Sequence, residues 1–252
     1  MELEKALLQY VLRLGDNALI IGQRLSEECG HGPILEEDLA IANFSLDFIG
    51  QATALLAYAG TLEGNGRNED QLAFQRNERE FVNALLTEQP NGNFAQLIVR
   101  QFLFDAYQYS HYKWLANSKD EMIAALSVKF LKEIDYHLRH SSQWMLRLGD
   151  GTQESHDKVQ SALDGLWKFT KDLFAETEAD QLLIEKGIAP SQAEVYHSWL
   201  ELVSKTIAEA TLTLPTSGFM RHGSREGIHT EHMGYLLAEM QYLPRTYPDA
   251  AW

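Results

Sequence analysis

Four long stretches of this sequence have the period of an α-helix, and they constrain the fold more than any other feature. Apolar residues recur in them at steps of three and four residues, and no alternating strand pattern interrupts them. Each stretch is about 24 to 30 residues long, or about 35 to 45 Å of helix. They run from about Leu3 to Glu28, Leu35 to Leu62, Phe94 to Asn117 and Lys119 to Leu148. The sequence therefore predicts an all-α fold.

The connections between these stretches predict how the helices are arranged. The first pair is joined through CGHGP at 29–33, and the second pair follows almost without a break. Between the pairs lie a loop at 63–70, a shorter helix from about Gln71 to Glu88 and the turn QPNGN at 89–93. Two helical hairpins joined by one long crossover are typical of a ferritin-like four-helix bundle.

The rest of the chain adds helices to this bundle. They are expected near residues 153–178, 191–210 and 229–245. No linker rich in Pro, Gly or Ser divides the 252 residues. We therefore predict a single ferritin-like domain over 1–252, with a bundle core at about 3–150 and a C-terminal helical annex at about 151–252.

Charge and cysteine content restrict the partners and the compartment. The chain has 36 acidic and 21 basic residues, and its formal net charge of -15 repels nucleic-acid phosphates and anionic membrane surfaces. Its one cysteine, Cys29, cannot form an internal disulfide, and no unbroken apolar run reaches the roughly 20 residues that cross a bilayer. We expect a cytoplasmic protein that binds neither nucleic acid nor membrane.

Each long stretch carries an acidic residue near its middle, among apolar neighbours. In ferritin-like di-iron proteins, two helices each supply one carboxylate, and the other two each supply a Glu-x-x-His pair. The sequence therefore predicts that four acids converge in the bundle interior at the positions of a di-iron centre. These acids are Asp16, Asp47, Asp105 and Glu133.

The histidines of such a centre are missing. The residues three positions after Asp47 and Glu133 are Gly50 and Tyr136, and neither a glycine nor a neutral phenol is a good ligand for iron. We therefore interpret the six positions as a vestigial di-iron site, with no metal and no catalytic residue. Buried acids without a metal need protons or protein cations, and Arg13 is on a suitable helix face.

Two histidine pairs offer a weaker metal hypothesis. His137 and His140 are three residues apart on one predicted helix, and His229 and His232 flank the start of the last one. Structural roles are the more common explanation, namely hydrogen-bonded core residues for the first pair and the start of a helix for the second. The sequence contains no nucleophile elbow and no phosphate-binding glycine loop.

Several long strings in the sequence resemble a known family. They are LRLGDNALIIGQRL, EEDLAIANFSLDFIGQA, LAFQRNEREFVNALL, EQPNGNFA, KEIDYHLRHSSQWMLRLGDGT, LWKFT and GIHTEHMGYLLAEMQYL. Together they resemble the accessory, C-type subunits of bacterial ring-1,2-phenylacetyl-CoA epoxidases, and the similarity spans nearly the whole chain.

This resemblance implies a non-catalytic role in a multicomponent monooxygenase. C-type subunits are ferritin-like, lack a functional di-iron centre and pair with a homologous catalytic A-type subunit that has one. The complex converts phenylacetyl-CoA to its ring 1,2-epoxide in aerobic phenylacetate breakdown, with dioxygen and electrons from a flavin and iron-sulfur reductase subunit. The resemblance thus implies no cofactor in this chain and binding to the A-type and other epoxidase subunits.

The resemblance also implies contacts with the coenzyme A part of phenylacetyl-CoA. Two segments are concerned, 80–83 and 181–183. The residue pattern of the first is explained equally well by an amphipathic helix face, and that of the second by an apolar contact within the protein. The residues concerned are Glu80, Phe81, Val82, Asn83, Gln181, Leu182 and Leu183.

Two other functions compete with the structural subunit. One is a divergent carboxylate-bundle metal oxygenase, active by itself, in which the four acids bind iron or manganese and water fills the vacated positions. The other is a helical module that binds acyl-CoA.

Overall fold

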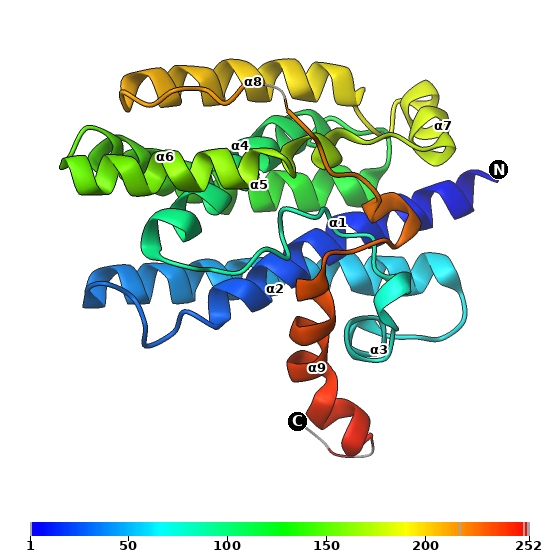
Figure 1. The fold of residues 1–252 in the computed structure, drawn as a ribbon. Helices are drawn as coiled ribbons and strands as arrows, with labels where there is room; N and C mark the ends of the chain where they lie inside the picture. Colours follow the sequence, from blue (N-terminus) through cyan, green and yellow to red (C-terminus); the bar gives the residue numbers. More distant parts are fainter. Residues whose placement is uncertain (1, 217, 249, 251–252) are drawn as a thin grey trace. The chain divides into compact units, whose positions relative to one another are not determined.

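The computed structural model describes residues 2–216, 218–248 and 250, and these form helices joined by turns and irregular segments (Figure 1). No strand occurs among them. The four long predicted helices are confirmed, and each observed end lies within two residues of its predicted position. Contacts between residues divide the chain into two compact units, which are described separately.

Unit 1 comprises residues 1–90 and 223–252. Its main feature is a helical hairpin of α1 and α2, and the last helix, α9, contacts α1, α3 and η1. Its elements are α1 (Leu3–Ser26), α2 (Leu35–Glu63), α3 (Glu69–Phe74), the 3-10 turns η1 (Glu78–Glu80) and η3 (Ser224–Glu226), and α9 (Glu231–Thr246).

Unit 2 comprises residues 91–222, and α4 lies at its centre because α5, α6 and α8 all pack against it. The fully buried Trp199 of α8 donates its indole N–H to the carbonyl of Leu103, with a distance of 3.0 Å between Nε1 and O. Its elements are α4 (Phe94–Leu115), α5 (Glu121–Gly149), α6 (Gln153–Trp167), the 3-10 turn η2 (Thr170–Phe174), α7 (Glu178–Lys186) and α8 (Gln192–Glu209).

Side-chain caps explain where several helices begin. Asn93 accepts a hydrogen bond from the backbone N–H of Gln96 at the start of α4, and Asp120 does the same for Ile123 at the start of α5. The predicted turn before α4 contains Gly92 at a φ of 62°, where a side chain would be strained. Local sequence therefore fixes these boundaries.

Two predicted helices are wrong in extent. The helix expected from Gln71 to Glu88 is only α3 and η1, and the chain from Phe81 to Asn93 is irregular. The helix expected at 153–178 ends at Trp167 and is followed by η2 and a separate α7. The predicted division at about residue 150 also differs from the two units, whereas a single domain over 1–252 stays a prediction.

Helix α2 is more hydrophobic than the sequence analysis implies. By length and composition it could cross a membrane, with a mean hydropathy of 1.4 over its most apolar 18 residues, and 44% of that window is buried. The expectation that no stretch of this kind exists is therefore wrong for α2. Core helices of globular proteins have the same properties, so α2 is not identified as a membrane span.

Candidate functional site

The side chain of Asp16 lies in the interior of unit 1 and binds an arginine. Asp16 is fully buried on α1, and both carboxylate oxygens accept hydrogen bonds from the guanidinium of Arg76. The distance between Arg76 Nη1 and Asp16 Oδ2 is 3.1 Å. The backbone N–H of Val82 donates to the same Oδ2 at 3.0 Å. A charge-assisted, two-pronged contact of this kind neutralises a buried carboxylate.

Arg76 is itself fully engaged. It is buried after the end of α3, donates through Nη1 to the carbonyl of Glu80 at 3.0 Å, and donates through Nε to the carbonyl of Leu72. Its guanidinium also lies 4.1 Å from the centre of the Phe81 ring. A protein cation binds Asp16, as the sequence analysis expected. The cation is Arg76, however, and not the predicted Arg13.

The neighbouring Asn17 completes a network that holds the segment after η1. Its Oδ1 accepts a hydrogen bond of 2.7 Å from the backbone N–H of Ala84. Together, Asp16, Asn17 and Arg76 bind backbone groups between Glu80 and Ala84. These groups therefore find partners without forming a helix, which explains why the predicted helix is broken here.

This network determines the accessibility of the first predicted coenzyme A segment. Phe81 and Asn83 are fully buried, Val82 is half-buried and Glu80 is exposed. The segment is not the amphipathic helix face that the alternative explanation requires. Contact with coenzyme A stays a prediction for these four residues, and only Glu80 and part of Val82 are accessible.

A second buried acid in unit 1 joins this segment to the C-terminal part of the chain. The carboxylate of Glu88 accepts hydrogen bonds from His229 Nδ1 at 2.9 Å, from the backbone N–H of Thr230 at 2.6 Å and from Asn83 Nδ2 at 3.2 Å. The other ring nitrogen of His229, Nε2, is 2.9 Å from the carbonyl oxygen of Phe81. His229 thus lies between two acceptors at the start of α9.

This geometry favours the charged form of His229. A carboxylate and a carbonyl can only accept, and a neutral imidazole has one N–H to donate, so both contacts are hydrogen bonds only in the imidazolium. Burial lowers the pKa of His229, but the hydrogen bond and the charge of Glu88 outweigh it, and the net pKa is raised. His229 therefore has a structural role, as the sequence analysis favoured.

Asp105 on α4 is a fully buried acid of unit 2, and its hydrogen-bond donors are neutral. Gln101 Nε2 donates to Oδ1 at 2.6 Å, and the hydroxyl of Ser141 on α5 donates to Oδ2 at 2.8 Å. Burial raises the pKa of Asp105 to about 6, and the nearby His137 and these two hydrogen bonds only partly oppose it. Asp105 therefore takes up a proton at a higher pH than an ordinary aspartate does.

The other predicted positions of the vestigial site are not interior. Asp47 and Glu133 are half-buried, and Gly50 and Tyr136 are exposed. Asp16 and Asp105 are therefore buried as expected, and Asp47 and Glu133 are less buried than expected. Convergence of the four acids stays a prediction. The fully buried polar residues lie one helical turn later on the same helices, at Gln51 and His137. Descent of these positions from a metal site stays a prediction.

The second predicted coenzyme A segment lies on α7 in unit 2. Leu183 is fully buried, Leu182 is half-buried and Gln181 is exposed. This pattern agrees with an apolar contact within the unit for Leu183. Ligand contact stays a prediction for all three residues.

The donor sets do not suit a metal ion. Among the described residues, no group of three or more His, Cys, Asp or Glu side chains is placed to hold one. Both oxygens of Asp16 are engaged by Arg76, and both oxygens of Asp105 are engaged by Gln101 and Ser141. A di-iron centre of the ferritin-like kind needs carboxylates whose oxygens face the metal, and the guanidinium on both oxygens of Asp16 does not suit that role, whereas hydrogen bonds of the kind found at Asp105 also occur on ligating carboxylates.

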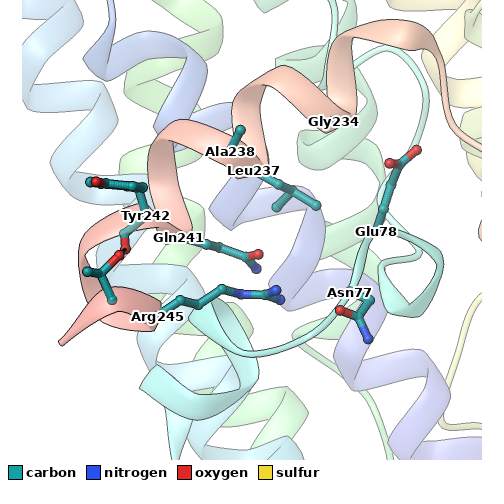
Figure 2. Close-up of a pocket in the computed structure, with 9 residues that line it drawn as sticks. Asn77, Glu78, Gly234, Leu237, Ala238, Gln241, Tyr242 and Arg245 are labelled. Carbon is teal, nitrogen blue, oxygen red and sulfur yellow. Dashed lines mark hydrogen bonds between the residues drawn. The ribbon is translucent and has the colours of Figure 1, made fainter. Parts of the chain in front are cut away.

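A pocket of about 420 Å³ in unit 1 lies between α9 and the segment around η1. Figure 2 shows Gln241 and Arg245 reaching from α9 toward Asn77 and Glu78. The polar ends of these two α9 residues are engaged: Gln241 donates to the carbonyls of Ala73 and Arg76, and Arg245 donates to three carbonyls at 74–76. The pocket is therefore a junction that attaches α9, and its polar groups are not arranged for catalysis.

The helical fold defines the structural class, which is ferritin-like. A solved structure described as "Protein 19 with aldehyde deformylating oxidase activity from Synechococcus" resembles this chain with a TM-score of 0.57. The two chains are 14% identical, and the match covers 84% of this chain and 95% of the other. The predicted all-α, ferritin-like fold is confirmed.

Sequence comparison then gives the family. The chain belongs to the phenylacetic acid catabolic protein family, whose model matches residues 1–252. It is 50% identical over 243 residues to the C-type component of the 1,2-phenylacetyl-CoA epoxidase of Escherichia coli (strain K12), and the match covers 96% of this chain and 98% of that protein. The resemblance inferred from the sequence strings is confirmed.

Proposed function

We propose that this chain is a non-catalytic structural subunit of a phenylacetyl-CoA 1,2-epoxidase, which stabilises a homologous di-iron catalytic subunit. One observation carries the proposal: the carboxylate of Asp16 is bound by Arg76 and by the backbone N–H of Val82. A metal ligand needs a free lone pair directed at the ion, and here the guanidinium of Arg76 binds both oxygens of the carboxylate. The family membership supports the same conclusion.

The metal content of the purified chain tests this proposal. We expect the chain, expressed in iron-supplemented medium and purified alone, to contain far less than stoichiometric iron by plasma emission spectrometry. The catalytic A-type subunit, prepared in parallel, is the positive control. Near-stoichiometric iron together with oxygen-dependent epoxidation by this chain alone would show that it is a metal oxygenase instead.

Assembly is tested by co-expression. We expect this chain and the A-type subunit to co-elute in gel filtration, and we expect the A-type subunit to unfold at a higher temperature in the complex than alone, because binding to the native state stabilises it. Two separate peaks at micromolar concentration, with an unchanged melting temperature of the A-type subunit, would contradict the proposed role.

Three further parts of the proposal concern cofactors, substrate and location. The proposed chain holds no cofactor, since the di-iron centre belongs to the catalytic subunit, and flavin and iron-sulfur belong to the reductase subunit. The complex works in the cytoplasm.

Contact with the coenzyme A end of the substrate is restricted to the accessible groups Glu80, Val82, Gln181 and Leu182. Isothermal titration of the complex with coenzyme A, before and after Glu80→Ala, tests that contact.

A further inference from the structure

One side of α2 is apolar along most of its length and exposed. Leu35, Leu39 and Leu46 are 70%, 55% and 68% exposed, whereas leucines are usually buried in folded proteins. These residues continue into a row at alternating steps of three and four residues, which places them on one helix face. The α2 face comprises Leu35, Leu39, Ala42, Leu46, Ile49, Gly50, Thr53 and Ala57.

The two halves of the α2 face differ in shape. The first half presents three large leucines, and the second half presents small side chains, among them Gly50 and Thr53. A Cβ atom added to Gly50 would meet no atom within 4 Å, so the surface above this glycine is open. Large side chains followed by a flat stretch of small ones give a partner helix both anchors and room for close approach.

The charges beside the α2 face are all negative. Glu36 and Asp38 flank it, and α2 contains no Lys, Arg or His between Leu35 and Glu63. A second copy of this chain would bring the same acids together, and each copy carries a formal net charge of -15. Like charges at an interface oppose association, so self-pairing is disfavoured. A different protein with basic residues is complementary.

The length of the α2 face suits a whole helix. From Leu35 to Ala57 a helix rises about 33 Å at 1.5 Å per residue. A contiguous apolar surface of this length on a folded chain marks a site of interaction with another protein. Helices pack through rows of apolar side chains at the same three- and four-residue steps.

We propose that the α2 face is the docking surface for a helix of the catalytic A-type subunit, a helix with an apolar stripe flanked by Lys or Arg. This inference rests on the proposed function, because it locates the surface of that assembly. Gly50 is then a contact position whose lack of a side chain lets the partner helix approach, and the exposed Glu36 pairs with a basic residue of that helix.

A bulky residue at Gly50 tests the location. We expect Gly50→Trp to weaken binding of the A-type subunit by about 30-fold or more, the effect of a substitution at an interface hot spot. The matched control is Gly165→Trp on α6 of unit 2, since Gly165 is also an exposed helical glycine with no atom within 4 Å of an added Cβ. We expect the control to bind as the unsubstituted chain does. Surface plasmon resonance with immobilised A-type subunit measures both.

A charge reversal tests the predicted chemistry of the partner. We expect Glu36→Lys to weaken binding by about 10-fold at low ionic strength, mainly through slower association, with a smaller effect at high salt. Glu201→Lys on α8 is the control, because Glu201 is exposed and the change in net charge is the same. An equal effect of both reversals would show that the net charge matters and that the α2 face does not.

The outcomes separate the two proposals. If the unsubstituted chain does not bind the A-type subunit, the proposed function fails and the inference fails with it. If it binds and Gly50→Trp binds equally well, only the inference fails, and the proposed function stands. The unsubstituted chain could instead form a homodimer or bind phosphatidylcholine vesicles. If Gly50→Trp abolished either of these, the α2 face would belong to another occupant and the inference would be overturned. Helical content measured by circular dichroism confirms that each variant is folded.

Discussion

The fully buried aspartates Asp16 and Asp105 lie in different units and have opposite surroundings. Asp16 in unit 1 is bound by the guanidinium of Arg76, whereas Asp105 in unit 2 accepts hydrogen bonds from the neutral groups of Gln101 and Ser141. The pKa of Asp105 is raised to about 6, chiefly by burial. Both acids sit in the middle of long helices, but only the first has a protein cation in direct contact.

The comparison shows two ways in which a protein can bury an acid without a metal. A paired guanidinium supplies the counter-charge of the carboxylate, and the Asp16–Arg76 pair also binds backbone groups of Glu80 and Val82. Burial without a cation in direct contact instead raises the pKa of the acid, as at Asp105, and the hydrogen bonds from Gln101 and Ser141 oppose that rise only partly. The second arrangement lowers the stability of the fold above the raised pKa, because the folded chain must then hold a buried charge.

The largest expected effect is the loss of the Asp16–Arg76 pair. Asp16→Asn leaves a buried guanidinium without its counter-charge, and we expect it to lower the free energy of unfolding by about 3 to 5 kcal/mol. Urea unfolding at pH 7 measures it. The double variant Asp16→Asn, Arg76→Leu should lose clearly less than the sum of the single losses, because the two residues act as a unit. Strictly additive losses would mean that the pair is not a unit.

The second expected effect has the opposite sign and depends on pH. A carboxyl whose pKa is higher in the folded chain than in the unfolded chain stabilises the fold at low pH and loses that contribution as the pH rises through the folded value. For Asp105 the difference between 3.8 and about 6 corresponds to about 3 kcal/mol. We expect Asp105→Asn to raise the free energy of unfolding at pH 8 by up to about 3 kcal/mol and to have little effect near pH 3, below both pKa values. Destabilisation at pH 8 would contradict a raised pKa.

The sequence predicts what local patterns determine. The period of apolar residues places the long helices, and the caps at Asn93 and Asp120 explain where two of them begin. Asp16 and Asp105 are also found correctly, since an acid in the middle of an apolar helix is conspicuous. These features depend on residues within a few positions of each other along the chain.

The sequence does not predict what depends on distant contacts. Arg76 lies 60 positions after Asp16, in a stretch of charged and polar residues that gives no sign of burial. Likewise Glu88 and His229 are 141 positions apart. Gly50 and Tyr136 were assigned from the three-residue spacing of a metal motif, but both positions are exposed. Two neighbouring faces of one helix share the same period, so the spacing alone does not show which face is buried.

The third effect concerns the contact between α9 and the segment before α4. The pKa of His229 is raised in the folded chain, so its stabilising contribution is present below its ordinary value and is lost as the pH rises through the raised value. We expect the free energy of unfolding to fall above neutral pH by about 2 kcal/mol from this residue, the value of a hydrogen bond to a charged group. His229→Gln should flatten that part of the profile. His197→Gln on α8, a substitution of the same type in the other unit, should leave it unchanged.

The smallest effect comes from an ion pair that resembles Asp16–Arg76 but is partly solvated. Glu63 and Arg67 are joined by a hydrogen bond of 2.8 Å between Nε and Oε2, and their side chains are 10% and 34% exposed. The hydrogen bond from Arg67 lowers the pKa of Glu63, so its contribution is lost as the pH falls through the lowered value. We expect a coupling energy of at most about 1 kcal/mol from a double-mutant cycle of Glu63→Gln and Arg67→Gln. Added salt should reduce this coupling but not that of the buried pair, because buried charges are screened much less. A coupling as large as that of Asp16 and Arg76 would show that burial is not what distinguishes the two pairs.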